Sequence, residues 1–107
     1  MLGGCVVALD MVLSNESSSN LSVNYDSGYS SQIGIGETSK ENYGVACIRI
    51  TSGGVTREFQ PDQPPDDFVE IGLFSTKIEA VYTKENRLVL LHKDEPNAKL
   101  ELNNHCN

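Results

Sequence analysis

The chain has 107 residues, 38% of them hydrophobic and 21% charged, and a formal net charge of −7. This length is typical of one domain, and the composition is neither that of a disordered chain nor that of a membrane protein. No stretch approaches the ~18 consecutive apolar residues of a spanning helix. Eight Lys and Arg stand against fifteen Asp and Glu, which argues against nucleic acid and anionic membranes as partners, because both are bound through clusters of basic residues.

Alternation of apolar and polar residues predicts short strands in place of helices. The first expected strand runs from Cys5 to Ser14, with Leu9, Met11 and Leu13 on one face. A Ser- and Asn-rich loop region follows over 14–31, interrupted by a strand at 20–25. Residues 38–42 are expected to form a polar turn. Further strands are expected, in chain order, at 32–36, with Ile33 and Ile35 pointing inward, and at 43–51, 55–60, 68–74, 76–82, 88–91 and 98–102.

Ser52-Gly53-Gly54 predicts a tight hairpin between the strands at 43–51 and 55–60, because paired glycines adopt the positive φ values that such turns require. The segment 61–67 contains three prolines and is expected to be an irregular crossover.

The fold class predicted from this pattern is all-β: an antiparallel β-sandwich of about 7–9 short strands, Greek-key or immunoglobulin-like or transthyretin-like. A small closed barrel is the alternative. Residues 6–107 are expected to form this single domain. Residues 1–5 are expected to be an N-terminal lead-in or the remnant of a targeting signal. Tryptophan is absent from the sequence, which argues against a true immunoglobulin core.

The three cysteines are Cys5, Cys47 and Cys106. Leu2-Gly3-Gly4-Cys5 resembles the end of a bacterial lipoprotein signal, in which the cysteine becomes lipidated after cleavage. This resemblance implies that Cys5 is the lipidation site, leaving Cys47 and Cys106 as a pair able to form a disulfide. The alternative interpretation is a glycine-rich lead-in to a cytoplasmic protein with three reduced thiols.

Candidate chemistry is sparse. Asp62, Asp66, Asp67 and Glu70 form a carboxylate cluster of the kind that binds hard cations, but a rigid solvated turn fits the prolines better. His92, His105 and Cys106 could supply three metal ligands if the C-terminal tail folds back, although nothing in the sequence places them together. A Cys–His catalytic pair lacks any accompanying motif. We therefore expect no catalytic residue, no metal, no cofactor and no enzymatic activity.

Candidate binding residues lie in two loop regions. Tyr25 and Tyr29 stand among Ser, Asn and Gly, a composition typical of recognition loops. Asp62, Asp66 and Asp67 are the acidic candidates. An ordinary solvated loop is the alternative interpretation of each region.

The function predicted is a non-enzymatic extracytoplasmic binding or interaction module with a protein or glycan partner, in the form of a small bacterial envelope lipoprotein whose one link to the membrane is its lipid anchor. One alternative is an acidic inhibitor or immunity protein that blocks a basic enzyme. A second alternative is a metal-binding protein or hydrolase that uses the loop Asp62–Glu70. The oligomeric state is not indicated.

Overall fold

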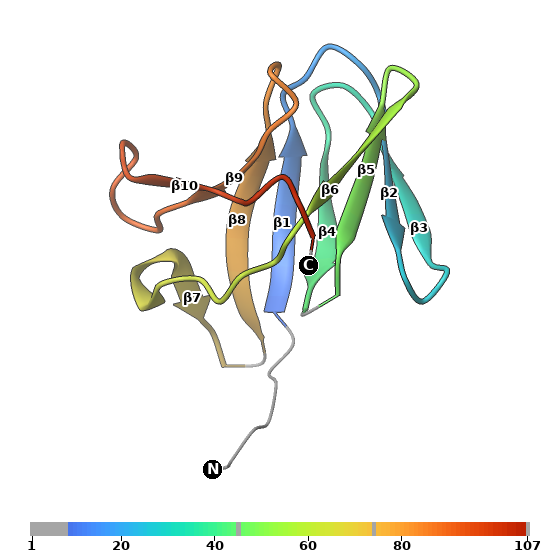
Figure 1. The fold of residues 1–107 in the computed structure, drawn as a ribbon. Coiled ribbons are helices and arrows are strands. Elements are labelled where there is room, and N and C mark those ends of the chain that lie inside the picture. Colours follow the sequence, from blue (N-terminus) through green and yellow to red (C-terminus); the bar gives the residue numbers. More distant parts are fainter. Residues whose placement is uncertain (1–8, 45, 74, 107) are drawn as a thin grey trace.

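The computed structural model describes residues 9–44, 46–73 and 75–106. These residues form two packed β-sheets and a single turn of 3-10 helix (Figure 1). The larger sheet contains β1 (Leu9–Asn15), β4 (Thr38–Tyr43), β7 (Val69–Ile71), β8 (Thr76–Tyr82), β9 (Leu88–Leu91) and β10 (Lys99–Glu101). The smaller sheet contains β2 (Leu21–Tyr25), β3 (Ser30–Ile33), β5 (Ile48–Ser52) and β6 (Val55–Phe59). The helical turn, η1, spans Asp66–Phe68. The predicted all-β sandwich is therefore confirmed.

The six-stranded sheet has the order β10-β9-β8-β1-β4, with β7 paired to β8. Strand β1 is central: it runs antiparallel to β4 and parallel to β8. Both β7 and β9 pair with β8, β7 opposite residues 76–78 and β9 opposite residues 79–82. The four-stranded sheet has the order β3-β2-β5-β6, and all its pairs are antiparallel.

The core lies between the sheets because alternate residues of each strand point inward. Strand β1 shows this directly, since Leu9, Met11 and Leu13 are buried while the residues between them are partly exposed. The rings of Phe59 and Tyr82, from opposite sheets, meet edge to face with centroids 5.8 Å apart. Edge-to-face contact is a favoured geometry for aromatic pairs. The strand periodicity seen in the sequence thus corresponds to the buried face of each sheet.

The predicted glycine hairpin is also found in the structure. Ser52 pairs with Val55, which leaves Gly53 and Gly54 as a two-residue turn with φ of 59° and 81°. Positive φ at both positions matches the right-handed twist of the flanking strands.

Two predicted segments were wrong. The expected single strand at 43–51 is divided, because β4 ends at Tyr43 in one sheet and β5 begins at Ile48 in the other. The expected polar turn at 38–42 lies within β4, where Glu41 and Tyr43 are buried. The alternation in this region spans a change of sheet, which a local pattern does not reveal.

The strand expected at 32–36 was shifted. Strand β3 covers Ser30–Ile33, and the chain then turns through Gly36, whose φ is 77°. Ile33 is buried as predicted, but Ile35 is 59% exposed because it lies in this turn and not in a strand. The beginning of the first predicted strand, residues 5–8, lies outside the described residues.

A buried asparagine holds the crossover from β1 to β2. Asn15 is fully buried, and its side-chain amide donates to the carbonyl oxygens of Ser19 and Ile33 at 2.8 and 3.0 Å. Its Oδ1 accepts hydrogen bonds from the backbone amide and the hydroxyl of Ser17. Every hydrogen-bonding group of this amide has a partner, so it stabilises the loop without an unsatisfied buried polar atom.

In the described part of the chain, no helix is long and apolar enough to cross a bilayer.

Candidate functional site

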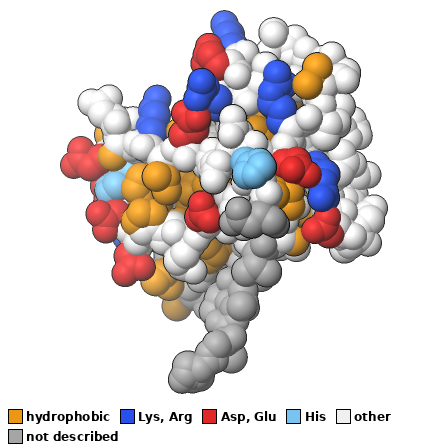
Figure 2. Space-filling model, in the orientation of Figure 1, with side chains coloured by type: hydrophobic (Ala, Val, Ile, Leu, Met, Phe, Trp, Pro, Cys, Tyr) orange, Lys and Arg blue, Asp and Glu red, His pale blue; other side chains and the backbone are white. Residues whose placement is uncertain are grey.

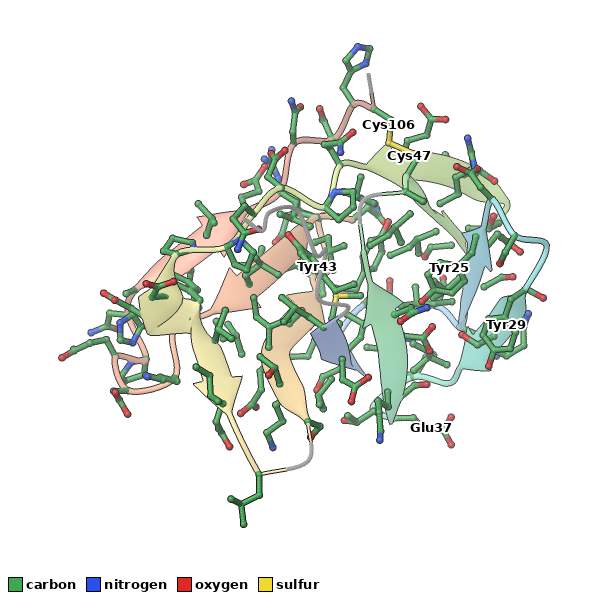
Figure 3. The ribbon with its side chains drawn as sticks, turned by 90° about the horizontal axis from the view of Figure 1, so that it is seen from below. Tyr25, Tyr29, Glu37, Tyr43, Cys47 and Cys106 are labelled. Atoms are coloured by element: carbon green, nitrogen blue, oxygen red, sulfur yellow. A yellow bond between two sulfur atoms is a disulfide. The ribbon has the colours of Figure 1, made fainter. Side chains whose placement is uncertain are left out.

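A small surface hollow lies where the β2–β3 loop meets the link between β4 and β5. Its volume is about 260 Å³. We call it the tyrosine hollow and define it by its lining residues, which are Tyr25, Asp26, Ser27, Tyr29, Asn42, Gly44 and Ala46. Figure 3 shows Tyr25 and Tyr29 close together on this side of the molecule.

The β2–β3 loop fixes the two aromatic rings in the tyrosine hollow. The amide of Tyr25 donates to the Tyr29 carbonyl, and the amide of Gly28 donates to the Tyr25 carbonyl, both at 3.0 Å. Gly28 has φ of 94°, which a residue with a side chain rarely adopts. The ring centroids of Tyr25 and Tyr29 are 5.8 Å apart, and Tyr29 is 64% exposed. The loop therefore presents one exposed aromatic ring beside a second, partly buried one.

The buried carboxylate of Glu41 fixes the position of the Tyr25 hydroxyl. Glu41 is only 4% exposed, and its oxygens accept hydrogen bonds from the hydroxyls of Tyr25 at 2.6 Å, Ser31 at 2.8 Å and Ser39 at 2.6 Å. The backbone amide of Asn42 in turn donates to the Tyr25 hydroxyl at 3.2 Å. Burial, and then the hydrogen bond to Glu41, raise the pKa of Tyr25 above its ordinary value. Tyr25 is thus a neutral and rigidly held wall of the tyrosine hollow.

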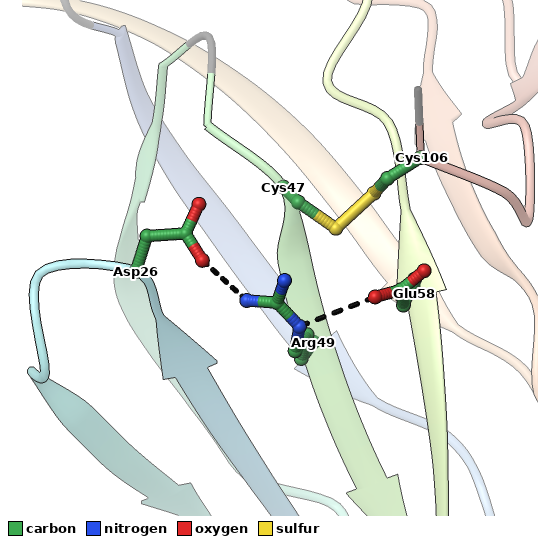
Figure 4. Close-up of a disulfide and its surroundings, with 5 residues drawn as sticks. All are labelled: Asp26, Cys47, Arg49, Glu58 and Cys106. Carbon is green, nitrogen blue, oxygen red and sulfur yellow. Dashed lines mark hydrogen bonds and ion pairs between the residues drawn. A yellow bond between two sulfur atoms is a disulfide. The ribbon is translucent and has the colours of Figure 1, made fainter.

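A charged cluster lies beside the hollow (Figure 4). The Arg49 guanidinium contacts the Asp26 carboxylate, and its Nε donates to Glu58 at 3.2 Å. Hydrogen bonding to Asp26 raises the pKa of Arg49. A broader, shallower depression of about 550 Å³ extends from here along β5 and β6, lined by Arg49, Thr56, Arg57, Glu58 and Asn104. Arg49, on β5, thus contacts both Asp26, which follows β2 and lines the tyrosine hollow, and Glu58 on β6.

A disulfide joins Cys47 to Cys106 across 59 positions of sequence. The bridge lies directly after the hollow residue Ala46 and ties the C-terminal segment to the start of β5 (Figures 3 and 4). This is the pairing that the lipoprotein-like start of the sequence implied. A disulfide of this kind indicates an oxidising environment.

The predicted binding residues fall into two places. Tyr25 and Tyr29 come together in the tyrosine hollow, whereas Asp62, Asp66 and Asp67 lie on the segment that leads through η1 to β7. The backbone carbonyl of Asp62 accepts a hydrogen bond from the buried Tyr43 hydroxyl. The Asp67 carboxylate lies 3.7 Å from Nε2 of His92. The lipidation candidate Cys5 lies outside the described residues.

The candidate metal ligands are not brought together. Among the residues that the structure describes, only Cys47, Glu58 and Cys106 place three potential ligand atoms near one another, and the disulfide leaves no thiolate there. The acidic loop 62–70 forms no such group, and neither do His92, His105 and Cys106. Nδ1 of His92 accepts hydrogen bonds from the amides of Asp94 and Glu95, so that nitrogen has a structural partner.

Sequence reasoning missed two residues of this region, Glu41 and Arg49. Glu41 falls within the expected polar turn at 38–42, and its burial on the same face as Tyr43 follows only once β4 is recognised as a strand. Arg49 falls within the strand expected at 43–51, and the sequence does not indicate that Asp26 and Glu58 are its partners.

Fold and site together define a two-layer β-sandwich with one disulfide and a small aromatic hollow formed by loops at one end. Comparison with protein-family models, curated proteins and solved structures finds no match. Function is therefore inferred from the geometry of the chain itself.

Proposed function

We propose that this chain is a non-enzymatic extracytoplasmic binding module that receives one group of a protein or glycan partner in the tyrosine hollow. The observation that carries this proposal is the exposed ring of Tyr29 held beside the ring of Tyr25 over a hollow of about 260 Å³. Tyrosine is frequent in binding sites because it offers a large amphipathic contact area at a low cost in conformational entropy.

The size of the hollow limits what enters it. Pockets for whole small molecules usually measure roughly 300–1,000 Å³, so about 260 Å³ suits one side chain or one sugar ring. Asp26, Ser27 and Asn42 add polar groups around the rings, and such groups orient a ligand once apolar contact has been made. The Tyr25–Glu41 hydrogen bond keeps one wall in place before binding, which lowers the entropic cost of association.

The proposed location follows from the cysteines. The Cys47–Cys106 disulfide supports an oxidising compartment. Cys5 follows Leu2-Gly3-Gly4, the arrangement found where bacterial lipoproteins become acylated. The module is therefore proposed to be a small envelope lipoprotein, anchored through Cys5.

Site-specific photocrosslinking tests the binding site. Tyr29 is replaced by a benzophenone amino acid in cells that produce the protein, and Ile35, 59% exposed in the β3–β4 turn, serves as the matched control. We expect an adduct at position 29 and none at position 35. The isolated partner should then bind the Tyr29→Ala variant at least about 10-fold more weakly than the native chain, as expected for an aromatic anchor.

A glycan array screened with native chain and Tyr29→Ala completes the test, because sugars crosslink poorly. Equal binding by both proteins, or no ligand in either experiment, would refute the proposed site.

The net charge of −7 favours a second candidate, an acidic inhibitor or immunity protein. Complexes formed through complementary charge associate more slowly and bind more weakly as salt increases. A partner whose affinity falls steeply between low and high salt, and is unaffected by Tyr29→Ala, would favour this alternative over the tyrosine hollow.

A further inference from the structure

The end of β7 and the turn that follows it expose two large aliphatic side chains. Ile71 is 81% exposed and Leu73 is 95% exposed, the highest values for large hydrophobic residues in the described chain. A hydrogen bond of 2.8 Å from the Gly72 amide to the Ser75 carbonyl closes the turn. We call residues 71–73 the apolar tip. Figure 2 shows hydrophobic side chains at the lower end of the molecule on the side of β7.

The apolar tip lies at the end of the molecule where the N-terminal segment enters the sandwich. Strands β1 and β8 are parallel neighbours, with Asp10 opposite Lys77, and both begin at the lower end in Figure 1. The tip ends three positions before the first residue of β8, Thr76, and residues 1–8 precede β1 in the sequence. Cys5 is four positions before Leu9, so no more than about 14 Å of extended chain separates them.

We propose that the apolar tip inserts into the surface of the bilayer to which Cys5 anchors the chain. This inference rests on the lipoprotein part of the proposed function. The register of β1 and β8 places the start of β1 and the tip at one end, so a lipid attached four residues before β1 is within reach of the membrane that the tip would enter. Two aliphatic side chains alone bind a membrane only weakly, and stable attachment combines such a contact with a second signal, here the anchor.

Charge defines the kind of membrane surface that suits the tip. The acidic residue next to the tip, Glu70, is paired with Lys77, whose Nζ lies 3.7 Å from its carboxylate. This pairing lowers the cost of bringing the strand close to lipid. The net charge of −7 opposes attraction to anionic headgroups. Insertion is therefore hydrophobic, into a zwitterionic surface.

Tryptophan fluorescence tests the inference directly, because the native chain contains no tryptophan. The Leu73→Trp variant is coupled through Cys5, the cysteine outside the disulfide, to a maleimide lipid in phosphatidylcholine vesicles. We expect its emission to shift to shorter wavelength on tethering and to be quenched by lipids that carry a spin label in the acyl chain. The matched control is Val55→Trp, 50% exposed in the hairpin at the opposite end. Its spectrum should stay that of water-exposed tryptophan.

Three results would overturn the inference. The first is a Leu73→Trp spectrum that is unchanged by tethering. The second is equal quenching at positions 73 and 55, which would indicate a non-specific orientation. The third is a shift that occurs without vesicles together with a doubled mass in sedimentation, which would assign the tip to contact with a second copy of the chain. The vesicle experiment attaches the chain chemically and so tests the tip alone. Acylation of Cys5 is tested separately, by mass spectrometry of protein from cells. A negative vesicle result therefore counts against the tip even if Cys5 proves to be acylated.

Discussion

The hydroxyl of Tyr25 donates a 2.6 Å hydrogen bond to the carboxylate of Glu41, which is almost completely buried between the two sheets. Glu41 belongs to the six-stranded sheet and Tyr25 to the four-stranded sheet, so this bond joins the two layers directly beneath the tyrosine hollow. The donor, Tyr25, was a binding-site candidate from the sequence, whereas the acceptor, Glu41, was not.

Glu41→Gln is expected to destabilise the fold. The amide of glutamine keeps one acceptor oxygen but replaces the other with a donor that faces hydroxyl groups. Leaving buried hydrogen-bonding groups without partners costs about 1–3 kcal/mol in the free energy of unfolding. Urea denaturation of the native chain and the variant measures this difference. Glu79→Gln, on an exposed position of β8, is the control and should change stability by less than about 0.5 kcal/mol. Equal stability of the two variants would show that the Glu41 carboxylate is dispensable.

Reduction of the disulfide is expected to lower the free energy of unfolding by about 4 kcal/mol. This value follows from the loop-closure entropy of a cross-link that spans 59 positions. Chemical denaturation with and without reductant measures it. The Cys47→Ser/Cys106→Ser variant should match the reduced native protein and should not respond to reductant. A native protein whose stability is the same in both conditions would contradict the constraint we assign to this bridge.

His92→Ala is expected to loosen the turn after β9. Nδ1 of His92 accepts the amides of Asp94 and Glu95 at 3.0 and 2.9 Å, and its ring packs edge-on against Phe68 with centroids 5.2 Å apart. Losing these contacts should cost about 1–3 kcal/mol in thermal or chemical unfolding.

His92→Asn provides the internal check, because its side-chain oxygen can accept the same amides and should recover part of the loss. His105→Ala, at an exposed position, is the control and should be neutral. If His92→Ala and His105→Ala prove equally mild, the histidine does not organise the turn.

Stability is expected to fall above about pH 10. Burial raises the pKa of Tyr43 and, together with the Glu41 hydrogen bond, that of Tyr25 above the ordinary value of 10.0. The unfolded chain therefore loses these phenolic protons first as pH rises. The stabilisation is complete below about pH 10 and declines above it, by at most about 1.4 kcal/mol per pH unit for each tyrosine.

Urea denaturation at about pH 8 and about pH 11 measures this decline. The Tyr43→Phe variant lacks the ionisable hydroxyl at this buried position. Its free energy of unfolding should therefore fall less between the two pH values than that of the native chain. A variant whose stability falls as steeply as that of the native chain would show that Tyr43 does not contribute.

The sequence by itself determined the fold class and the main strands. At Leu9–Asn15 and at residues 78–80 of β8 the buried and exposed sides follow from neighbouring residues alone, because side chains alternate between the faces of a strand, whereas the burial of Val81 on the opposite face does not. The Gly53-Gly54 turn was predictable for the same reason, since the φ values it requires belong to the glycines themselves. Tyr25 and Tyr29 could be proposed as one site because the loop between them is short.

Only the tertiary structure decided how these pieces meet. The division of 43–51 between two sheets, the burial of Glu41 under three hydroxyl donors and the contact between Asp67 and His92 all depend on residues far apart in the sequence. The Cys47–Cys106 pairing was implied by the lipoprotein-like start of the sequence, and its place beside the tyrosine hollow came from folding. Strand periodicity is a local property of the backbone, whereas the order of strands and the partners of buried polar groups are set by packing across the whole domain.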